Sequence, residues 1–506
     1  MNLMSYRASV NEIGGERIAV LLLLFALAIY QFYSMGFGAF AAVCMLPALV
    51  LVALLSFRSR MTVFWALVIV NFFLQMKSMP KPSAIPTSFY NEVFEIILLL
   101  QALIDVKESK HSSTLNIMLG ALIIWCTVVI LQVMNDTCGM AWDFGAWYTG
   151  ARLMAFQLLY AFLVFTIYIN TPNNLIKYLC LWGGLSLFSV FWMWKQKYVG
   201  FTAAEKSFLE GSVTHVLRSG TLIRYFSTFN DAACAGIYLA STAVAFIIIG
   251  LTSKIKRYKY IFLLIGIACT WGMFPTGTRT AIACFLAGFA VYTILSKSVK
   301  MTICIGTVGL LFFFILAFTN IGASNQMIRR MRTVFDKNDT SAGARTANKA
   351  VIRKYMTDAP FGIGVGIKAG DIASNHKYFI MTMIPPDSEY VYIWIHTGTV
   401  GLGFFVFTTF IMFFGASRIV LFKLTSSSLR GIGAGLICAF VSAHLGGYAN
   451  QVLMQFPLCL TFYGGLSIVY VLPFIEKEWV MYEERILSAQ VEKKRLKEEK
   501  KLASRV

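Results

Sequence analysis

Four arginines stand where the chain passes between polar and apolar sequence. Arg152 and Arg279 each begin an apolar run. Arg224 lies just before another run, and Arg345 is in the longest polar segment. A guanidinium group can make two parallel hydrogen bonds to phosphate oxygens, so together these arginines predict a binding site for a diphosphate group. Each arginine alone fits contact with lipid headgroups equally well, except Arg279, whose short turn between two apolar runs keeps its charge at or below the membrane surface.

Side chains that could accept a proton gather near the end of the same polar segment. Asp387 and Glu389 come directly before an apolar run. His396 lies a few residues inside that run, and His376 precedes all three. A carboxylate or imidazole next to a substrate hydroxyl can act as its general base. Solvated residues at the entrance of a membrane span would give the same pattern, so both interpretations stay open.

The glycines at 362, 364 and 366 do not form a nucleotide-binding loop, because no Gly-Lys-Ser or Gly-Lys-Thr follows them. We expect them to let the chain turn and pass close to a glycan or to another backbone. The five histidines have no metal-ligand spacing and no Cys-x-x-Cys is present. The sequence therefore predicts no metal site and no other cofactor.

The composition excludes a soluble protein. Of the 506 residues, 58% are hydrophobic and only 13% are charged. No water-soluble fold of this size has enough interior for so much apolar surface. The net charge of +20 is explained by cytoplasmic loops rich in Lys and Arg, so we expect a lipid bilayer and no nucleic acid around the chain.

Recurring apolar runs of spanning length predict an all-α polytopic membrane protein with about 12–14 transmembrane helices and one large helical loop. The first two predicted spans are 18–35 and 38–57. The predicted divisions are an N-terminal helix bundle, a large periplasmic loop, the C-terminal transmembrane helices and a basic cytoplasmic helical tail, at 1–320, 321–390, 391–475 and 476–506.

Lys and Arg concentrate in alternate loops, for example at 254–259 and in the tail. By the positive-inside rule, both termini are cytoplasmic and the large loop faces the opposite side. The four arginines and Asp387 are then predicted on the outer face.

Short segments in the second half of the chain share a recognisable order. Thr-Gly-Thr-Arg-Thr-Ala occupies 276–281, and Pro-Phe-Gly-Ile-Gly-Val-Gly occupies 360–366, fifteen residues after Arg345. Asp387-Ser-x-Tyr then leads into the span that contains Gly398. Together with a weaker match at 224–230, these segments resemble the O-antigen ligase and polymerase family of multi-span bacterial glycosyltransferases.

The resemblance implies transfer of a glycan from undecaprenyl diphosphate to an acceptor hydroxyl, first of all on lipid A core, at the periplasmic face of the bacterial inner membrane. It implies an inverting reaction without a metal ion. Arg279 and Arg345, with Arg152 and Arg224, would bind and stabilise the leaving diphosphate. Asp387 would be the base, with His376, Glu389 and His396 as alternatives.

The sequence departs from the family at positions that concern the base and the acceptor. Relatives often have histidine at the position of Asp387, an acidic residue at that of His396, and tryptophan at that of Lys349. A repeat-unit polymerase acting on a glycan acceptor and a protein O-oligosaccharyltransferase share the same features. A lipid-linked sugar flippase is the rival from another class, and it predicts charges deep within several spans and pseudo-symmetric halves.

Overall fold

The computed structural model describes residues 60–78, 87–104, 113–139, 144–211, 216–217, 222–321, 329, 332, 340–368 and 370–503. The chain divides into two units, 1–66 and 67–506. In the first unit the structure describes only the beginning of helix α4 (Arg60–Phe73). The predicted spans at 18–35 and 38–57 lie outside the described residues. All that follows concerns the second unit.

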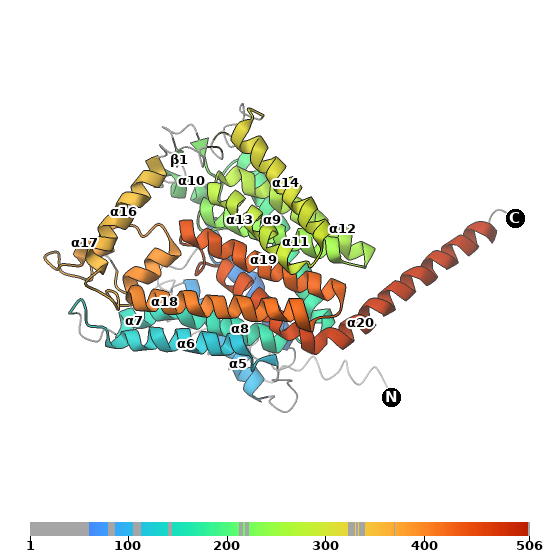
Figure 1. Cartoon of the computed structure of the whole chain (residues 1–506), viewed down its shortest axis with the longest axis horizontal. Helices are drawn as coiled ribbons and strands as arrows, with labels where there is room; N and C mark the ends of the chain where they lie inside the picture. The colour runs from blue at the N-terminus through green and yellow to red at the C-terminus, as the bar shows by residue number, and fades with distance from the viewer. Residues whose placement is uncertain are drawn as a thin grey trace, which may run out of the picture. The chain divides into compact units, whose positions relative to one another are not determined.

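The second unit is built almost entirely of helices (Figure 1). Within the described residues, one ladder joins β1 (Val216–Leu217) to β2 (Leu222–Ile223) in antiparallel register, with Val216 opposite Ile223. The α-helices are α5 Thr87–Ile104, α6 Ile117–Leu131, α7 Phe144–Ala151, α8 Gln157–Tyr168, α9 Pro172–Tyr198, α10 Ala203–Glu210, α11 Ala232–Thr252, α12 Lys256–Met273, α13 Arg279–Leu295, α14 Val299–Phe318, α16 Thr340–Met356, α17 Phe379–Met383, α18 Glu389–Arg418, α19 Ser427–Ala449 and α20 Leu458–Ala503. Short helices complete the set: the 3₁₀ turns η2 (Gln132–Met134) and η4 (Phe274–Thr276), and the π turns η3 (Arg152–Phe156) and η6 (Ile419–Lys423).

Within the described residues, eight helical stretches are long and apolar enough to cross a membrane, and α4 and α13 are shorter apolar helices. The prediction of an all-α polytopic membrane protein is confirmed. A bilayer offers no hydrogen-bond partners, so helices that satisfy their own backbone are the natural result of such apolar runs. The total of about 12–14 spans stays a prediction.

Helix α11 is the centre of the unit, and α12, α13 and α19 pack against it. Small residues allow this close approach, as is usual between membrane helices. A Cβ atom on Gly266 of α12 would lie 2.6 Å from the Ile247 side chain, and one on Gly435 of α19 would lie 2.9 Å from the Ala245 carbonyl oxygen. Around this centre, α18 packs on α6, and α20 packs on α8 and α19.

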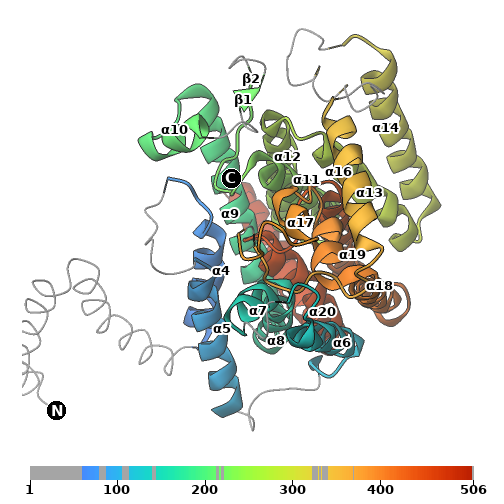
Figure 2. The ribbon, with the colours of Figure 1, turned by 90° about the vertical axis from the view of Figure 1, so that its left-hand side faces the viewer.

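The segment from α16 to α18 has a small hydrophobic core of its own. Ile352 and Met356 of α16 are buried together with Met381 of α17 and with Val391 and Ile395 of α18. This core holds α16 and α17 over one end of α18. Figure 2 looks onto that end, with α16 and α17 in front of α19.

The last helix runs across the predicted division at 476, which stays a prediction. Helix α20 continues without a break from Leu458 to Ala503. Trp479 is buried beyond that boundary, and its indole Nε1 donates to Ser428 Oγ at 3.0 Å. A helix keeps its own backbone bonds when the solvent changes, so the change in polarity at 476 does not end it.

Candidate functional site

Arg224 and Arg279 meet at the turn before α13. After η4, Gly277 turns the chain with φ +58°, and α13 begins at Arg279. Arg224 donates from Nε to Thr276 O (3.2 Å) and from Nη2 to Thr278 Oγ1 (3.1 Å). The Tyr225 amide adds a bond to the Pro275 carbonyl at 3.3 Å. The segment beginning at Arg224 is therefore fastened to the turn that presents Arg279.

Arg279 is half-buried at the first residue of a 17-residue helix. A positive charge at this end opposes the helix dipole, so the charge of Arg279 does not stabilise α13 through that dipole. Free backbone N–H groups at a helix N-terminus attract anions. The guanidinium and the helix end together favour an anionic ligand at this point.

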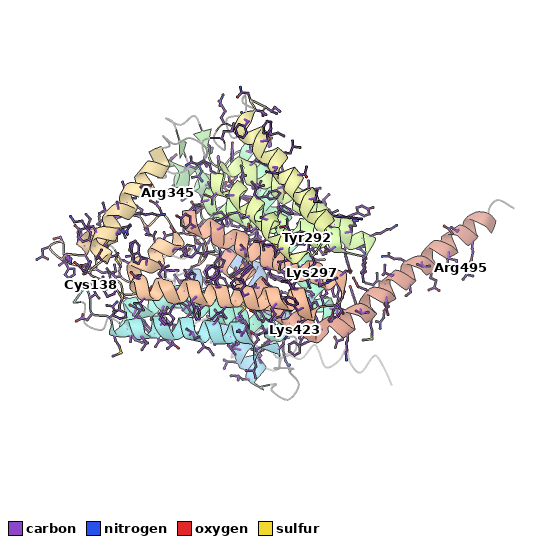
Figure 3. All side chains as sticks on the ribbon, viewed as in Figure 1. Cys138, Tyr292, Lys297, Arg345, Lys423 and Arg495 are labelled. Carbon is purple, nitrogen blue, oxygen red and sulfur yellow. The ribbon has the colours of Figure 1, made fainter. Side chains whose placement is uncertain are left out.

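The start of α13 is joined to α19, and α19 to α16. Asn450, at the end of α19, donates from Nδ2 to Thr280 Oγ1 at 3.3 Å. Two residues earlier, the Tyr448 ring lies 4.6 Å from Lys349 Nζ. Arg345 is one helical turn before Lys349 and shares its side of α16. Figure 3 shows Arg345 on this helix.

Helix α16 in turn touches the residue predicted as the base. Asn348 Nδ2 donates to Asp387 Oδ2 at 3.1 Å. Asp387 is half-buried and has φ +52°, a conformation that few residues other than glycine adopt. Such backbone positions cluster at functional sites. The next residue, Ser388, is buried and donates from Oγ to Gly447 O at 3.2 Å. The carboxylate is thus held at the junction of α16, α18 and α19.

We call this set of side chains the polar rim. Five elements supply it: the segment beginning at Arg224, the start of α13, helix α16, the start of α18 and the end of α19. Its members are Arg224, Arg279, Thr280, Arg345, Asn348, Lys349, Asp387, Tyr448 and Asn450.

Arg152, predicted to belong to the same group, has a different environment. It is buried in the π turn η3, with Nε 3.0 Å from Glu92 Oε1. Gln157 Nε2 donates to the same carboxylate oxygen at 3.1 Å. A carboxylate of the protein therefore neutralises this guanidinium, whereas Arg224, Arg279 and Arg345 belong to the polar rim. π turns inside helices are frequent at functional sites, and Arg152 is the first residue of this one.

The three alternative bases have distinct surroundings. Glu389 is buried and accepts a hydrogen bond from the Leu453 amide at 2.9 Å, which fixes the loop after α19. His376 lies in the loop before α17, and its Nδ1 accepts from the Tyr378 amide at 3.2 Å. His396 is buried, with Nδ1 2.8 Å from Gly364 O. A carbonyl oxygen can only accept, so Nδ1 carries the proton and Nε2 of the neutral ring keeps its lone pair.

A cavity of about 320 Å³ lies beside the polar rim, in the volume range of small-molecule sites. Its polar lining includes Thr149, Lys368, Thr382, Tyr392, His396 and Gln451. Pro386, also in its wall, precedes Asp387, and Gln451 follows Asn450. The cavity therefore adjoins two elements of the rim, and His396 is the alternative base that lines it.

The glycine segment forms one wall of this cavity by passing close to other backbone. The Ile363 and Gly364 amides donate to Ile395 O (2.9 Å) and His396 O (3.2 Å). Here α18 is kinked at Gly398, which has φ +70°. The sequence left two partners open for the glycine segment, a glycan or another backbone. The structure shows contact with another backbone.

We predict that Gly362→Ala destabilises the protein by at least about 2 kcal/mol. Gly362 has φ +83°, and a Cβ atom there would lie 2.5 Å from backbone atoms of His396 and Gly398, which cannot move aside as a flexible side chain can. Thermal unfolding of the purified protein in detergent would measure the loss. Gly343→Ala in α16 is the matched control, because it opens onto free space and should not lower the melting temperature. Equal melting temperatures for the two variants would contradict the prediction.

Sequence reasoning missed several polar residues of this end. Lys77, which follows α4, donates from Nζ to Asn230 Oδ1 at 2.7 Å and lies 4.4 Å from the Phe208 ring centre. Burial lowers the pKa of Lys77, whereas the nearby negative charge of Asp231 acts to raise it. Asn348 carried a usable signal, because it is three residues after Arg345 on a helix. Tyr448 and Asn450 carried none, since polar residues are common at the ends of spans.

Part of the chain matches a known protein family. Residues 262–406 match the family model described as O-antigen ligase. This stretch includes Arg279, Arg345, Asp387 and His396. No curated protein matches the chain.

Proposed function

We propose that this chain, whose residues 262–406 match the O-antigen ligase family model, transfers a glycan from undecaprenyl diphosphate to an acceptor hydroxyl. The single observation that carries the proposal is the polar rim. Arg345 and Lys349 lie on the helix whose Asn348 donates to the Asp387 carboxylate. Lys349 also contacts Tyr448 near the end of α19, and Asn450 at that end donates to Thr280, the residue after Arg279. A cation cluster beside a fixed carboxylate suits a reaction that releases an anion and takes up a proton.

In the proposed reaction the donor diphosphate lies against Arg279 and Arg345, with Arg224 holding the turn. Asp387 takes the proton of the acceptor hydroxyl, and the oxygen attacks the anomeric carbon. The bond from that carbon to the diphosphate oxygen breaks, and its electron pair leaves with the diphosphate. Preorganised guanidinium groups stabilise this growing charge without a metal ion. Attack from the side opposite the leaving group inverts the anomeric centre.

The acceptor would occupy the cavity next to Asp387. Its wall offers hydrogen-bonding groups from Thr382, Tyr392 and Gln451, as sugar hydroxyls require. The neutral His396 ring, with Nε2 unprotonated, would receive a further hydroxyl. Lipid A core is our first candidate acceptor, and a growing glycan or a protein hydroxyl would use the same chemistry.

The proposal includes an orientation in the bacterial inner membrane. The polar rim would face the periplasm and both termini the cytoplasm. The divisions at 1–320, 321–390, 391–475 and 476–506 would then be a helix bundle, a periplasmic loop, the last spans and a cytoplasmic tail. This arrangement supports the function because undecaprenyl-linked glycans are consumed on the periplasmic side.

One observation favours a second candidate, a lipid-linked sugar flippase. Glu92, Glu95 and Arg152 are buried charged residues within or next to predicted spans. Such residues often mark transport paths. They lie on α5 and η3, outside residues 262–406 that match the family model, so we rank this function second.

Deleting the gene and analysing the cell's glycans tests the proposed function. Loss of all capped lipopolysaccharide would indicate ligation, capping with a single repeat unit would indicate polymerisation, and under-glycosylated proteins would indicate protein transfer. In each case the undecaprenyl-linked glycan should accumulate on the periplasmic side. Accumulation on the cytoplasmic side would support the flippase instead. Unchanged glycans and unchanged lipid-linked donor would contradict both functions.

A further inference from the structure

A second cavity lies at the other end of α18. It is a groove of about 670 Å³ between the start of α6, the last turns of α18 and the middle of α20. Phe407, Phe410 and Phe414 form one wall, at helical spacings that place them on one side of α18. Their side chains are 56%, 55% and 61% exposed, so within the described structure they are open to the surroundings.

The floor of the groove is well defined. Tyr470 of α20 lies in it and donates from Oη to Met412 O at 2.7 Å. Gly415 also lines the groove, and a side chain at this position would collide with the Tyr470 hydroxyl. The groove is thus formed by a close approach of α18 and α20, and a larger residue at 415 would disturb it.

Two cations close one end of the groove. Arg418 and Lys423 both line it, and both side chains are exposed. Residues five apart point about 140° away from each other on a regular α-helix. Here the intervening turn η6 is a π-helix, and the Leu424 amide donates to Ile419 O five residues back, at 3.1 Å. A π turn brings residues five apart to nearly the same side, so it gathers Arg418 and Lys423 at the groove.

The end of the groove that holds Arg418 and Lys423 is far from the polar rim. Arg418 and Glu389 are the two ends of one 30-residue helix, roughly 40 Å apart along its axis. Figure 3 shows Lys423 and Lys297 near each other and Arg345 well to their left, on the far side of the helix bundle. Lys297 adds to the charge there, since its Nζ donates to Leu421 O and lies 4.7 Å from the Phe422 ring centre.

We propose that this groove is a binding site for an anionic phospholipid. The acyl chain lies along Phe407, Phe410 and Phe414, and the phosphate lies between Arg418 and Lys423. An apolar wall that continues into a pair of cations is complementary to a lipid with a charged head, whereas a free phosphate would need no aromatic wall. The positive-inside pattern puts this end of α18 in the cytoplasmic leaflet, where basic pockets between helices bind anionic lipids. Snorkelling alone would satisfy each cation without gathering the two by a π turn.

The test uses the full-length protein in detergent, titrated with phosphatidylglycerol, cardiolipin or phosphatidylethanolamine and followed by native mass spectrometry. We expect the two anionic lipids to be retained at least about tenfold better than phosphatidylethanolamine. The Arg418→Gln/Lys423→Gln double variant should abolish this preference. The matched control is Lys256→Gln/Arg257→Gln, which removes the same charges from exposed positions at the start of α12 and should bind like the wild type.

Two further experiments test whether the aromatic wall contributes to lipid binding and whether a free phosphate competes for the site. Phe410→Ala/Phe414→Ala keeps both cations but removes part of the wall, and it should weaken retention of the anionic lipids while leaving the melting temperature in lipid-free detergent unchanged. Inorganic phosphate at millimolar concentration should not displace them. Equal losses in the two double charge variants, no loss in either, or displacement by inorganic phosphate would overturn the proposal. None of these results depends on glycan transfer.

Discussion

Replacing Arg279 by alanine is expected to lower glycan transfer by at least about a hundredfold, the usual effect of removing one preorganised donor to a developing oxyanion. Arg279 begins α13, where its charge opposes the helix dipole, so its removal should leave the fold intact. The measurement is complementation of a deletion strain, with surface glycan read on a gel and protein level read in the membrane fraction. Binding of undecaprenyl diphosphate to the purified variant should weaken as well.

Two variants make this result specific. Arg279→Lys keeps the charge but loses the two-pronged hydrogen bond, so its activity should fall between those of the wild type and the alanine variant. Arg257→Ala on α12 removes an exposed arginine remote from the rim and should transfer glycan normally. Wild-type glycan in the Arg279→Ala strain would remove Arg279 from the mechanism and with it the main support for a diphosphate site.

Replacing Asp387 by asparagine is expected to reduce turnover by about a hundredfold or more, because loss of a general base costs that much in typical enzymes. Binding of undecaprenyl diphosphate should change little. The substitution suits the structure, since asparagine tolerates the positive φ at this position and its Oδ1 can still accept from Asn348. The measurements are the rate of glycan transfer and the affinity of the purified protein for undecaprenyl diphosphate.

Asp358→Asn is the matched control, because Asp358 is exposed in the same part of the chain and pairs with Lys377. It should transfer glycan at the wild-type rate. If Asp387→Asn also keeps full turnover, the base must be elsewhere, and His396→Asn becomes the decisive variant. Its side-chain amide can still donate to Gly364 O, but nothing replaces the Nε2 lone pair in the cavity. A loss there would assign the base to His396 in place of Asp387.

The polar rim shows how far sequence reasoning reached. Arg279 and Asp387 could be chosen as site candidates because each stands where an apolar run begins. The position of such a run in the membrane follows from hydropathy. Asn450 and Tyr448 could not, because they reach Thr280 and Lys349 across long stretches of chain. Contacts of this kind depend on which helices are neighbours.

Arg152 shows most clearly what could not be predicted from the sequence. Its position at the start of a span resembles that of Arg279, so the two were grouped. Hydropathy gives the depth of a residue but not its direction around the bundle. Packing of α5 beside α8 decides that direction and puts the Arg152 guanidinium 3.0 Å from Glu92.

The sequence by itself therefore determined that this chain is a helical membrane protein, because a bilayer forces apolar runs to become helices whatever their neighbours are. It also predicts which residues lie near a membrane surface. Tertiary structure alone decided which of those residues share a site. It brought α13, α16, α18 and α19 together at the polar rim and turned Arg152 inward. The reason is that lipid distinguishes polar from apolar residues only by depth, whereas neighbouring helices are chosen by side-chain packing and by hydrogen bonds between distant segments.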